Sequence, residues 1–439
     1  MELDRHNFSN ARKALVRYQI PFTAEEERQA RVYEDVTEQM KKERCDYVSI
    51  FIEDYRGTGV VLYRPPFTLT TEKTLYVRDE INKLPKGAVT NNVLYEKHVS
   101  RELKTSREQF TALKTSLTNQ ISCVIGGAGT GKSFVTATII DQLLRNKRKT
   151  VVLAPTHKAR EALQDKLDSQ NVNITVKTIH SFVHNPTECE AIVIDESGML
   201  STPLFASLME IYHGQQLVFV GDKNQLEPID YGRPFERIQE RFIVSELKDN
   251  KRSESADIVA LGREILGIPQ NANMPIENIE IVESVEKAFE HGAEVALSFT
   301  NNDVKVINEK KRIKNGQPTI SEGFSVGDVI VAKTNQRNRF YNGQLFKMVA
   351  FNMAQKAHSD KVVTFANDKD LKFNFDLAYG LTIHKSQGSE WDVVAYKPSN
   401  SDYQNLAYVA VTRAKKKLII VGDQIQKDYL PNREWRHVE

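Results

Sequence analysis

The sequence predicts an α/β protein with two domains built on parallel sheets, a small inserted β-barrel and an N-terminal accessory module. Between residues 121 and 222, short and almost continuously apolar segments alternate with helical patterns, as in a parallel sheet covered on both faces. A glycine-rich turn follows the first of these segments. A second series of alternations begins near Glu294 and is interrupted by short strands with period-two patterning.

Composition limits the possible classes of protein. The 439 residues are enough for two to four domains, and 40% hydrophobic with 27% charged residues is ordinary for a globular protein. No apolar run approaches the roughly 20 residues of a membrane span, and the first residues lack the apolar core of a signal peptide. The three scattered cysteines argue against disulfides and structural zinc, so we expect a cytoplasmic protein. The formal net charge of +2 gives no global support for nucleic-acid binding.

Residues 1–92 are predicted to form the accessory module and carry no chemical motif. Thr23 and Glu26 form a capping-box pattern at the start of an amphipathic helix. The apolar segments 47–52 and 59–64 flank a turn at Gly57, as the strands of a β-hairpin would. We expect this module to pack on the remainder of the chain or on a partner protein.

The glycine-rich turn has the pattern of a phosphate-binding loop between a strand and a helix. Its glycines let backbone N–H groups approach an anion closely, and Lys132 is placed to reach the β- and γ-phosphates of a nucleotide. The Ser133 hydroxyl is placed to bind Mg²⁺. A chance glycine turn before a lysine is the alternative, and the strand–turn–helix context argues against it. The predicted loop consists of Gly126, Gly127, Ala128, Gly129, Thr130, Gly131, Lys132 and Ser133.

Carboxylates and amides follow neighbouring strands of the same predicted sheet. Asp195 and Glu196 end a buried strand, where one carboxylate can hold Mg²⁺ through water and the next can take a proton from an attacking water molecule. Gln225 lies on the loop after the next strand, where its amide could orient that water or contact the γ-phosphate. Gln109 lies one short helix before the phosphate loop and could pair with the adenine edge, although alone it would read as a surface glutamine.

Two arginines are candidates for stabilising charge on the γ-phosphate. Arg252 lies in segment 247–258, towards the end of the predicted first domain, and Arg413 lies in segment 405–423, just before the last apolar strand of the second domain. An arginine delivered from another domain can couple hydrolysis to domain closure. Taken alone, either residue would read as a surface arginine.

Eight segments, in this order, resemble the motifs of superfamily 1 DNA helicases of the RecD and Dda branch, over about residues 93–423. The segments are GGAGTGKS (126–133), APTHKAR (154–160), TIHSF (178–182), DESGM (195–199), GDKNQLEPI (221–229), Arg252, LTIHKSQGSEWDVV (381–394) and AYVAVTRAK (407–415).

The resemblance implies two RecA-like P-loop NTPase domains that close on ATP and Mg²⁺, with single-stranded DNA across their top. The implied boundaries are 93–268 for the first domain, 269–320 with 377–439 for the second, and 321–376 for an inserted SH3-like β-barrel. The implied nucleotide roles are Gln109 on adenine, Lys132 on the phosphates, Ser133 and Asp195 on Mg²⁺, Glu196 on water, Gln225 on the γ-phosphate, Arg252 and Arg413 on transition-state charge, and Gly388 and Glu390 lining the nucleotide. The implied DNA contacts are Thr156, His157, His180, Thr300, Asn301, Thr382 and His384.

The function that follows is an ATP-dependent DNA helicase or translocase, acting in replication, recombination or repair. The HKSQGSE segment and the barrel-like insert favour movement 5′ to 3′. In this branch a β-hairpin pin lies between the TIHS segment and the DESGM segment, whereas only residues 183–189 occupy that place here. Strand separation is then left to the N-terminal module, the barrel or a partner. We expect a monomeric motor from a bacterium or a phage.

Three other functions stay open on sequence alone. A P-loop kinase or nucleotide switch would leave the HKSQGSE and TRAK segments without a role. An ATPase that remodels RNA or nucleoprotein would use the same segments on another substrate. A recruitment factor would place the main role in the N-terminal module.

Overall fold

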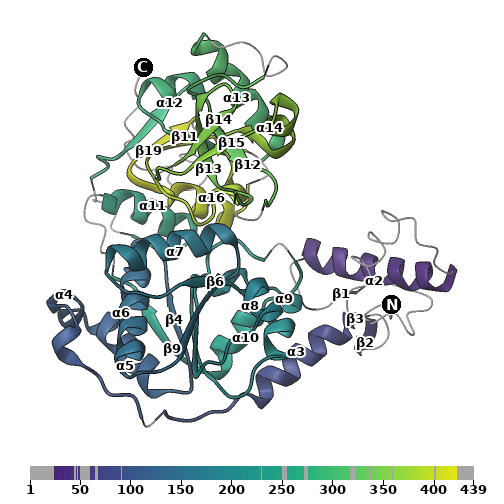
Figure 1. The fold of residues 1–439 in the computed structure, drawn as a ribbon, viewed down its shortest axis with the longest axis vertical. Helices are drawn as coiled ribbons and strands as arrows, with labels where there is room; N and C mark the ends of the chain where they lie inside the picture. Colours follow the sequence, from purple (N-terminus) through teal and green to yellow (C-terminus); the bar gives the residue numbers. More distant parts are fainter. Residues whose placement is uncertain are drawn as a thin grey trace.

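The computed structural model describes residues 24–43, 46, 48–49, 60–64, 68–89, 91–228, 230–249, 255–270, 275–316, 323–336, 339–357, 359–399 and 402–422. Two α/β bodies lie one above the other, and the N-terminal segment projects from the side of the first (Figure 1). Each body contains a parallel sheet, which confirms the predicted α/β fold class. Within these ranges, no helix is both long and apolar enough to cross a membrane.

The first body is a six-stranded, fully parallel sheet in the order β6-β5-β7-β8-β4-β9. Its strands are β4 (Ile121–Gly126), β5 (Thr150–Ala154), β6 (Val176–Thr178), β7 (Ala191–Ile194), β8 (Gln216–Gly221) and β9 (Ile243–Leu247). Its helices are α4 (Arg101–Thr105), α5 (Arg107–Thr118), α6 (Lys132–Arg145), α7 (His157–Ser169), α8 (Ile179–His184), α9 (Thr202–Met209) and α10 (Pro234–Arg241), with a 3-10 turn at Ser197–Met199.

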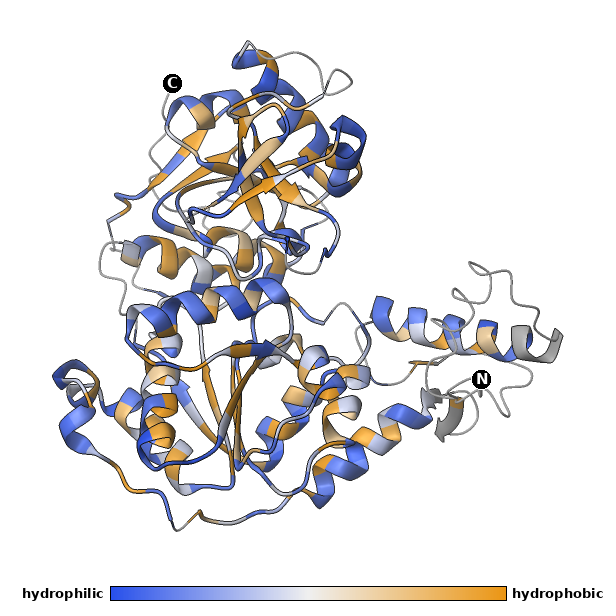
Figure 2. Cartoon of the chain, viewed as in Figure 1, coloured by the Kyte–Doolittle hydropathy of each residue, from blue (hydrophilic) through white to orange (hydrophobic). Residues whose placement is uncertain are grey.

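Helices cover both faces of this sheet because its strands alternate their side chains between two cores. Val124 of β4 packs in one core with residues of α5, α6 and α7. Its neighbours Cys123 and Ile125 pack in the other, with residues of α8, α9 and α10. Burying each aliphatic side chain contributes about 1.5–3 kcal/mol. Figure 2 shows these strands as apolar along their length.

The second body holds a five-stranded parallel sheet in the order β10-β19-β18-β11-β17. Its strands are β10 (Ile279–Val282), β11 (Val295–Ser298), β17 (Gly380–Thr382), β18 (Trp391–Tyr396) and β19 (Ala414–Val421). Its helices are α11 (Ala256–Ile265), α12 (Val285–Glu290), α13 (Asn301–Lys314), α15 (Ile383–Ser386) and α16 (Gln404–Val411).

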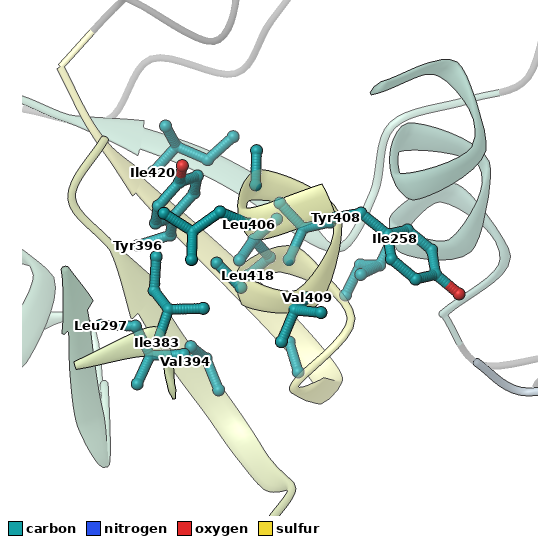
Figure 3. Packing of buried hydrophobic residues seen from close by; sticks show 14 of the residues in the cluster. Ile258, Leu297, Ile383, Val394, Tyr396, Leu406, Tyr408, Val409, Leu418 and Ile420 are labelled. Carbon is teal, nitrogen blue, oxygen red and sulfur yellow. The ribbon is translucent and has the colours of Figure 1, made fainter. Parts of the chain in front are cut away.

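Helix α11 packs with this second body. Ile258 of α11 lies in one core cluster with Val409 of α16 and Leu418 of β19 (Figure 3). The packing therefore joins α11 to the second sheet, upstream of the boundary at residue 268 that the sequence predicts.

An antiparallel sheet interrupts the second body between β11 and β17. Its order is β15-β14-β13-β12-β16, and closure of this sheet into a barrel stays a prediction. Its core contains Phe340, Phe346, Phe365 and Phe375, whose rings meet edge to face or tilted. The elements are β12 (Val329–Ala332), β13 (Leu345–Ala350), β14 (Met353–Lys356), β15 (Val362–Thr364), α14 (Asp368–Asn374) and β16 (Phe375–Leu377).

In its described residues, the N-terminal segment contains two helices and a three-stranded antiparallel sheet in the order β1-β3-β2. Because β3 lies between β1 and β2, the predicted hairpin between these two strands is wrong. The apolar pattern located β1 and β2, but the Thr-rich β3 that pairs with both gave no comparable signal. The elements are α2 (Ala24–Glu43), β1 (Val48–Ser49), β2 (Val60–Arg64), β3 (Thr68–Thr71) and α3 (Glu72–Lys83); Thr23 lies outside the described residues.

This segment is attached to the first body by buried polar contacts. The hydroxyls of Tyr33 and Tyr231 lie 3.0 Å apart, and Thr71 donates to the Tyr231 hydroxyl at 3.2 Å. Arg237 of α10 forms an ion pair of 2.8 Å with Asp46. The described part of this segment thus contacts the first body, and its role as an accessory module stays a prediction.

Candidate nucleotide and nucleic-acid site

The predicted phosphate loop joins the end of β4 to the start of α6. Gly129 and Gly131 have φ of 77° and 83°, which side chains with a Cβ rarely adopt. A Cβ on Gly126 would lie 2.6 Å from the Thr130 hydroxyl oxygen and 2.9 Å from the Leu247 carbonyl oxygen. Glycine is therefore required at these three positions by geometry.

Polar groups of the loop are engaged by the protein itself. The Lys132 ammonium donates to the carbonyl oxygens of Gly126 at 2.6 Å and Gly127 at 2.9 Å. The Ser133 hydroxyl accepts a hydrogen bond of 2.9 Å from Lys166 of α7. No sequence pattern distinguishes Lys166, because a lysine near the end of a helix is usually a solvated residue.

Gln109 lies against the phosphate loop, and only one end of its side-chain amide forms a hydrogen bond. It is 2% exposed, and its amide donates to the Thr130 carbonyl oxygen at 3.2 Å. Among the residues that the structure describes, none forms a hydrogen bond with its buried Oε1. A buried acceptor without a partner costs about 1–3 kcal/mol, so this oxygen suits a ligand that brings a donor.

Asp195 and Glu196 follow β7, at the carboxyl edge of the sheet. Glu196 has a φ of 50°, a left-handed conformation that costs a non-glycine residue about 1–3 kcal/mol. Burial raises the pKa of both carboxyl groups, and repulsion from Asp195 raises the pKa of Glu196 further. The cations Lys132 and Lys166 oppose both pKa shifts.

Arg413 of the second body lies close enough to Glu196 to act on its charge. Its electrostatic effect lowers the pKa of Glu196, against the larger effect of burial. Arg413 is 4% exposed, and its guanidinium donates to the carbonyl oxygens of Val409 at 3.1 Å and Ser389 at 3.3 Å. Arg252 lies outside the described residues, so its place in the cleft stays a prediction.

Tyr408 of α16 also reaches across the boundary, and sequence reasoning assigned it no role. The Ala128 N–H donates to its hydroxyl at 2.9 Å, and that hydroxyl donates to Asp222 at 2.9 Å. Asp222 in turn accepts from the Asn224 N–H, in the loop that carries Gln225. Tyr408 stands five residues before Arg413 in the AYVAVTRAK segment, and this position is the one sequence signal for it.

The HKSQGSE segment contacts the first body mainly through α7 and the Gln225 loop. A Cβ on Gly388 would lie 3.6 Å from the Ala159 nitrogen, and the Gln387 amide donates to the Leu226 carbonyl oxygen at 3.4 Å. Lys158 of α7 donates to the Lys385 carbonyl oxygen. The structure thus places Gly388 against α7, and the proposed nucleotide contacts of Gly388 and the half-buried Glu390 stay predictions.

Threonines cap four helices that start after parallel strands. Thr156 accepts from the Ala159 N–H at the start of α7, and Thr178 from the Ser181 N–H at the start of α8. In the second body, Thr300 and Thr382 cap α13 and α15 in the same way. Three of these caps, Thr156, Thr300 and Thr382, are among the predicted DNA residues. The other predicted DNA residues lie in the first turn of the same helices, and these are His157, His180, Asn301 and His384.

The insert covers one of these helix starts. The rings of His157 and Tyr341 are stacked, and the Arg160 guanidinium lies 5.2 Å from the Tyr341 ring centroid. Burial lowers the pKa of His157, and Arg160 lowers that pKa further. Sequence reasoning missed Tyr341, since none of the motifs named above includes it.

The connection between α8 and β7 is short, as the sequence indicates. Helix α8 ends at His184 and β7 begins at Ala191. The structure describes every residue between them, and none belongs to a strand. This place therefore holds no β-hairpin.

Comparisons with known proteins give two family matches. A model described as an AAA domain matches residues 104–268, and a model of the UvrD-like helicase C-terminal domain matches residues 377–421. The two regions carry the phosphate loop and Arg413, respectively.

The chain is also similar to several whole proteins. It is 24% identical to an uncharacterized protein of Methanocaldococcus jannaschii, over 82% of this chain and 41% of that protein. It is 26% identical to the ATP-dependent RecD2 DNA helicase of Deinococcus radiodurans, over 95% of this chain and 63% of that protein. The chain thus spans about half the length of these two relatives.

A third relative is the RecBCD enzyme subunit RecD of Mycolicibacterium smegmatis, which is 25% identical over 73% of this chain and 71% of that subunit. The Pif1 helicase of Candida albicans has a similar structure, with a TM-score of 0.48 and 18% identity over 73% of this chain and 95% of that one. Together with the family matches, the RecD relatives confirm the predicted resemblance to superfamily 1 helicases of the RecD branch.

Proposed function

We propose that this chain is an ATP-dependent DNA helicase or translocase that moves 5′ to 3′ on single-stranded DNA, acting in replication, recombination or repair. The observation that carries the proposal is the shared boundary between the two bodies. There the second body supplies Tyr408 and Arg413 beside the phosphate loop and Glu196 of the first. A change in the nucleotide at this boundary therefore changes how the two bodies contact each other.

Adenine and phosphate fit the groups at the first body. The unpartnered Oε1 of Gln109 suits the exocyclic amine of adenine, which is a donor. Lys132 and the N–H groups of residues 126–133 suit the β- and γ-phosphates. Gly388 and Glu390 are proposed to line the nucleotide from the second body after domain movement.

Mg²⁺ fits beside Ser133 and Asp195. The Lys166 ammonium, which bonds the Ser133 hydroxyl and lowers the pKa of Asp195, already puts positive charge at this position. A hydroxyl with a carboxylate is also the oxygen donor set that Mg²⁺ takes beside phosphates. When bound, the ion would neutralise charge on the phosphate oxygens.

The remaining groups of the cleft have distinct proposed tasks in hydrolysis. Glu196 takes the proton of the attacking water, for which its raised pKa makes it a better base than an ordinary carboxylate. Gln225 orients that water and senses the γ-phosphate. Arg413 and Arg252 stabilise the charge that develops on the transferred phosphoryl group.

Single-stranded DNA is proposed to cross the starts of the capped helices. A helix N-terminus carries unpaired N–H groups and a partial positive charge, both of which favour phosphate. Each body contributes two such starts, so the grip of each can vary separately with the nucleotide. Alternating grip then gives directional steps. The proposed contacts are Thr156, His157, His180, Thr300, Asn301, Thr382 and His384.

The test is the rate of ATP hydrolysis with and without an unstructured DNA oligonucleotide. We expect the DNA to stimulate the wild-type rate, Lys132→Ala to abolish the activity, and Glu196→Gln to bind ATP without hydrolysing it. A rate that is indifferent to DNA would contradict the motor and favour a nucleotide switch. Stronger stimulation by an RNA oligonucleotide of the same sequence would favour RNA remodelling.

The direction of movement is tested with a pair of DNA duplexes. Duplexes with either a 5′ or a 3′ single-stranded tail are offered with ATP, and strand separation is followed by gel. We expect separation of the 5′-tailed duplex. Separation of the 3′-tailed duplex alone would overturn the proposed polarity.

A further inference from the structure

We propose that Tyr408 is the positioning residue through which the second body senses whether the phosphate loop is occupied. The inference rests on the proposed function, since it adds a residue to the same nucleotide cleft. In this inference the phenol hydroxyl and a nucleotide phosphate compete for one backbone N–H group of the loop.

The Tyr408 hydroxyl contacts the phosphate loop directly. The Ala128 N–H donates to the Tyr408 hydroxyl oxygen at 2.9 Å, and a Cβ on Gly127 would lie 3.0 Å from that oxygen. Phosphate loops hold their anion through such N–H groups. Tyr408 therefore occupies a donor that a bound phosphate would take.

The ring of Tyr408 is held in place by the core of the second body. Tyr408 is 3% exposed, and its ring packs in the core of the second body, with the hydroxyl directed away from the cluster (Figure 3). A Cβ on Gly262 of α11 would lie 3.3 Å from the Tyr408 Cδ2 atom. Because the ring is enclosed, its hydroxyl leaves the loop only when α16 moves, and α16 leads directly to Arg413.

The Tyr408 hydroxyl is also linked to the loop that carries Gln225, the proposed sensor of the γ-phosphate. The Tyr408 hydroxyl donates to one carboxylate oxygen of Asp222 at 2.9 Å, and the other accepts from the Asn224 N–H at 2.9 Å. Asp222 is 3% exposed, so losing either bond leaves a buried oxygen without that partner. Tyr408 thereby joins the phosphate loop and the Gln225 loop to the same helix of the second body.

The test is the nucleotide affinity of Tyr408→Phe, which keeps the ring and removes the competing hydroxyl. Affinities for ADP and for a non-hydrolysable ATP analogue are measured by fluorescence competition. We expect binding about 2- to 10-fold tighter than wild type, the range of one hydrogen bond. Tighter binding separates competition from damage to the fold, which would weaken binding.

A matched control removes a part-buried tyrosine–aspartate bond that lies wholly within the second body. The Tyr396 hydroxyl donates to Asp402, within the second body. We expect Tyr396→Phe to bind both nucleotides as the wild type does. Unchanged or weaker binding by Tyr408→Phe, or an equal gain in both variants, would overturn the inference.

Hydrogen exchange of the Ala128 amide gives a second readout. One of its measurements uses only the wild-type protein. We expect this amide to be protected in nucleotide-free wild type, to exchange faster in Tyr408→Phe, and to be equally protected in both when nucleotide saturates the site. Rapid exchange in nucleotide-free wild type contradicts the inference even if the variant does not fold.

The two levels of proposal fail in different ways. If the wild-type protein neither binds nor hydrolyses ATP, the proposed function fails and the role of Tyr408 with it. If DNA stimulates hydrolysis, Lys132→Ala abolishes it, and Tyr408→Phe matches Tyr396→Phe, only the inference on Tyr408 fails.

Discussion

The imidazole of His157 and the phenol ring of Tyr341 lie face to face, with centroids 3.9 Å apart and 10° between the ring planes. His157 begins α7 of the first body, and Tyr341 lies in the insert. Close by, Glu161 accepts the Gln344 amide and forms an ion pair of 3.2 Å with Lys356. The insert is thus docked on a helix start that we assign to DNA.

Tyr341→Ala is expected to release this contact. Burial is the main cause of the lowered pKa of His157, so the pKa should rise towards its ordinary value of 6.5 in the variant. NMR titration of the imidazole measures this shift, and hydrogen exchange at the start of α7 should quicken. Tyr341→Phe keeps the stacked ring and should leave both readouts near wild type.

The same stack should weaken on acidification. A folded pKa below 6.5 means that the released histidine binds more protons, so stability is lost as the pH falls below about 6.5. Exchange at the start of α7, after correction for the intrinsic rate, should therefore quicken as the pH falls from about 6.5 to 5. Other charged groups also face this site, namely Arg160, Glu161 and Lys356, and protonation of His180 adds to the loss of stability. The variant His157→Phe is therefore needed to assign the pH response to His157. An unchanged pH response in that variant would remove His157 as the cause.

Glu196 should be needed for ATP hydrolysis and should lower the stability of the fold. Its raised pKa means that folding disfavours the charged form, so the carboxylate destabilises the protein at pH 7. Its φ of 50° adds a conformational strain that glycine would relieve. We expect Glu196→Gln and Glu196→Gly to unfold at higher temperature than wild type, and both to lose hydrolysis. Calorimetry checks the order, and a lower melting temperature for Glu196→Gly would show that the strain is absent.

Gln109 should determine the choice of base. Its buried Oε1 lacks a partner among the described residues and suits the amine of adenine, whereas guanine presents a carbonyl oxygen at that position. Gln109→Ala should weaken ATP binding by about tenfold and reduce the preference for ATP over GTP. Competition between the two nucleotides measures both effects. Equal loss of ATP and GTP would instead indicate that Gln109 only supports the loop through Thr130.

Local patterns in the sequence predicted the first sheet and its polar edge, because each strand, turn and helix start there is encoded within a few residues. The contacts between the bodies could not be predicted in this way. Tyr408 and Ala128 are 280 residues apart, and their pairing depends on how two complete cores pack. The stacking of His157 on Tyr341 depends on where the insert docks. The wrong hairpin in the N-terminal segment has the same origin, since alternation identifies a strand but not its neighbour.

The buried pair of Arg312 and Asp328 should hold the insert to α13. Their side chains are 1% and 0% exposed, and the Arg312 Nε lies 3.5 Å from an Asp328 carboxylate oxygen. Arg312→Met leaves a buried carboxylate without its cation and should cost about 3–5 kcal/mol in the free energy of unfolding. Urea unfolding measures the loss. The double variant Arg312→Met with Asp328→Leu should recover part of it, and no recovery would point to the bonds from Arg312 to Gly323 and Ser325 instead.

Lys158 should make the contact between the two bodies more stable as the pH rises above neutral. Burial lowers its pKa to about 7, and the charge of Arg413 adds to that shift. Between about pH 7 and 10 the released lysine binds a proton that the docked one lacks, so the docked form gains stability as the pH rises. Lys158→Met keeps an apolar stem beside Trp391 and removes the titrating group. Exchange at residues 385–388 should slow from pH 7 to 9 in the wild type, after correction for the intrinsic rate, and show no such trend in Lys158→Met. The same trend in both proteins would assign the titration to another group.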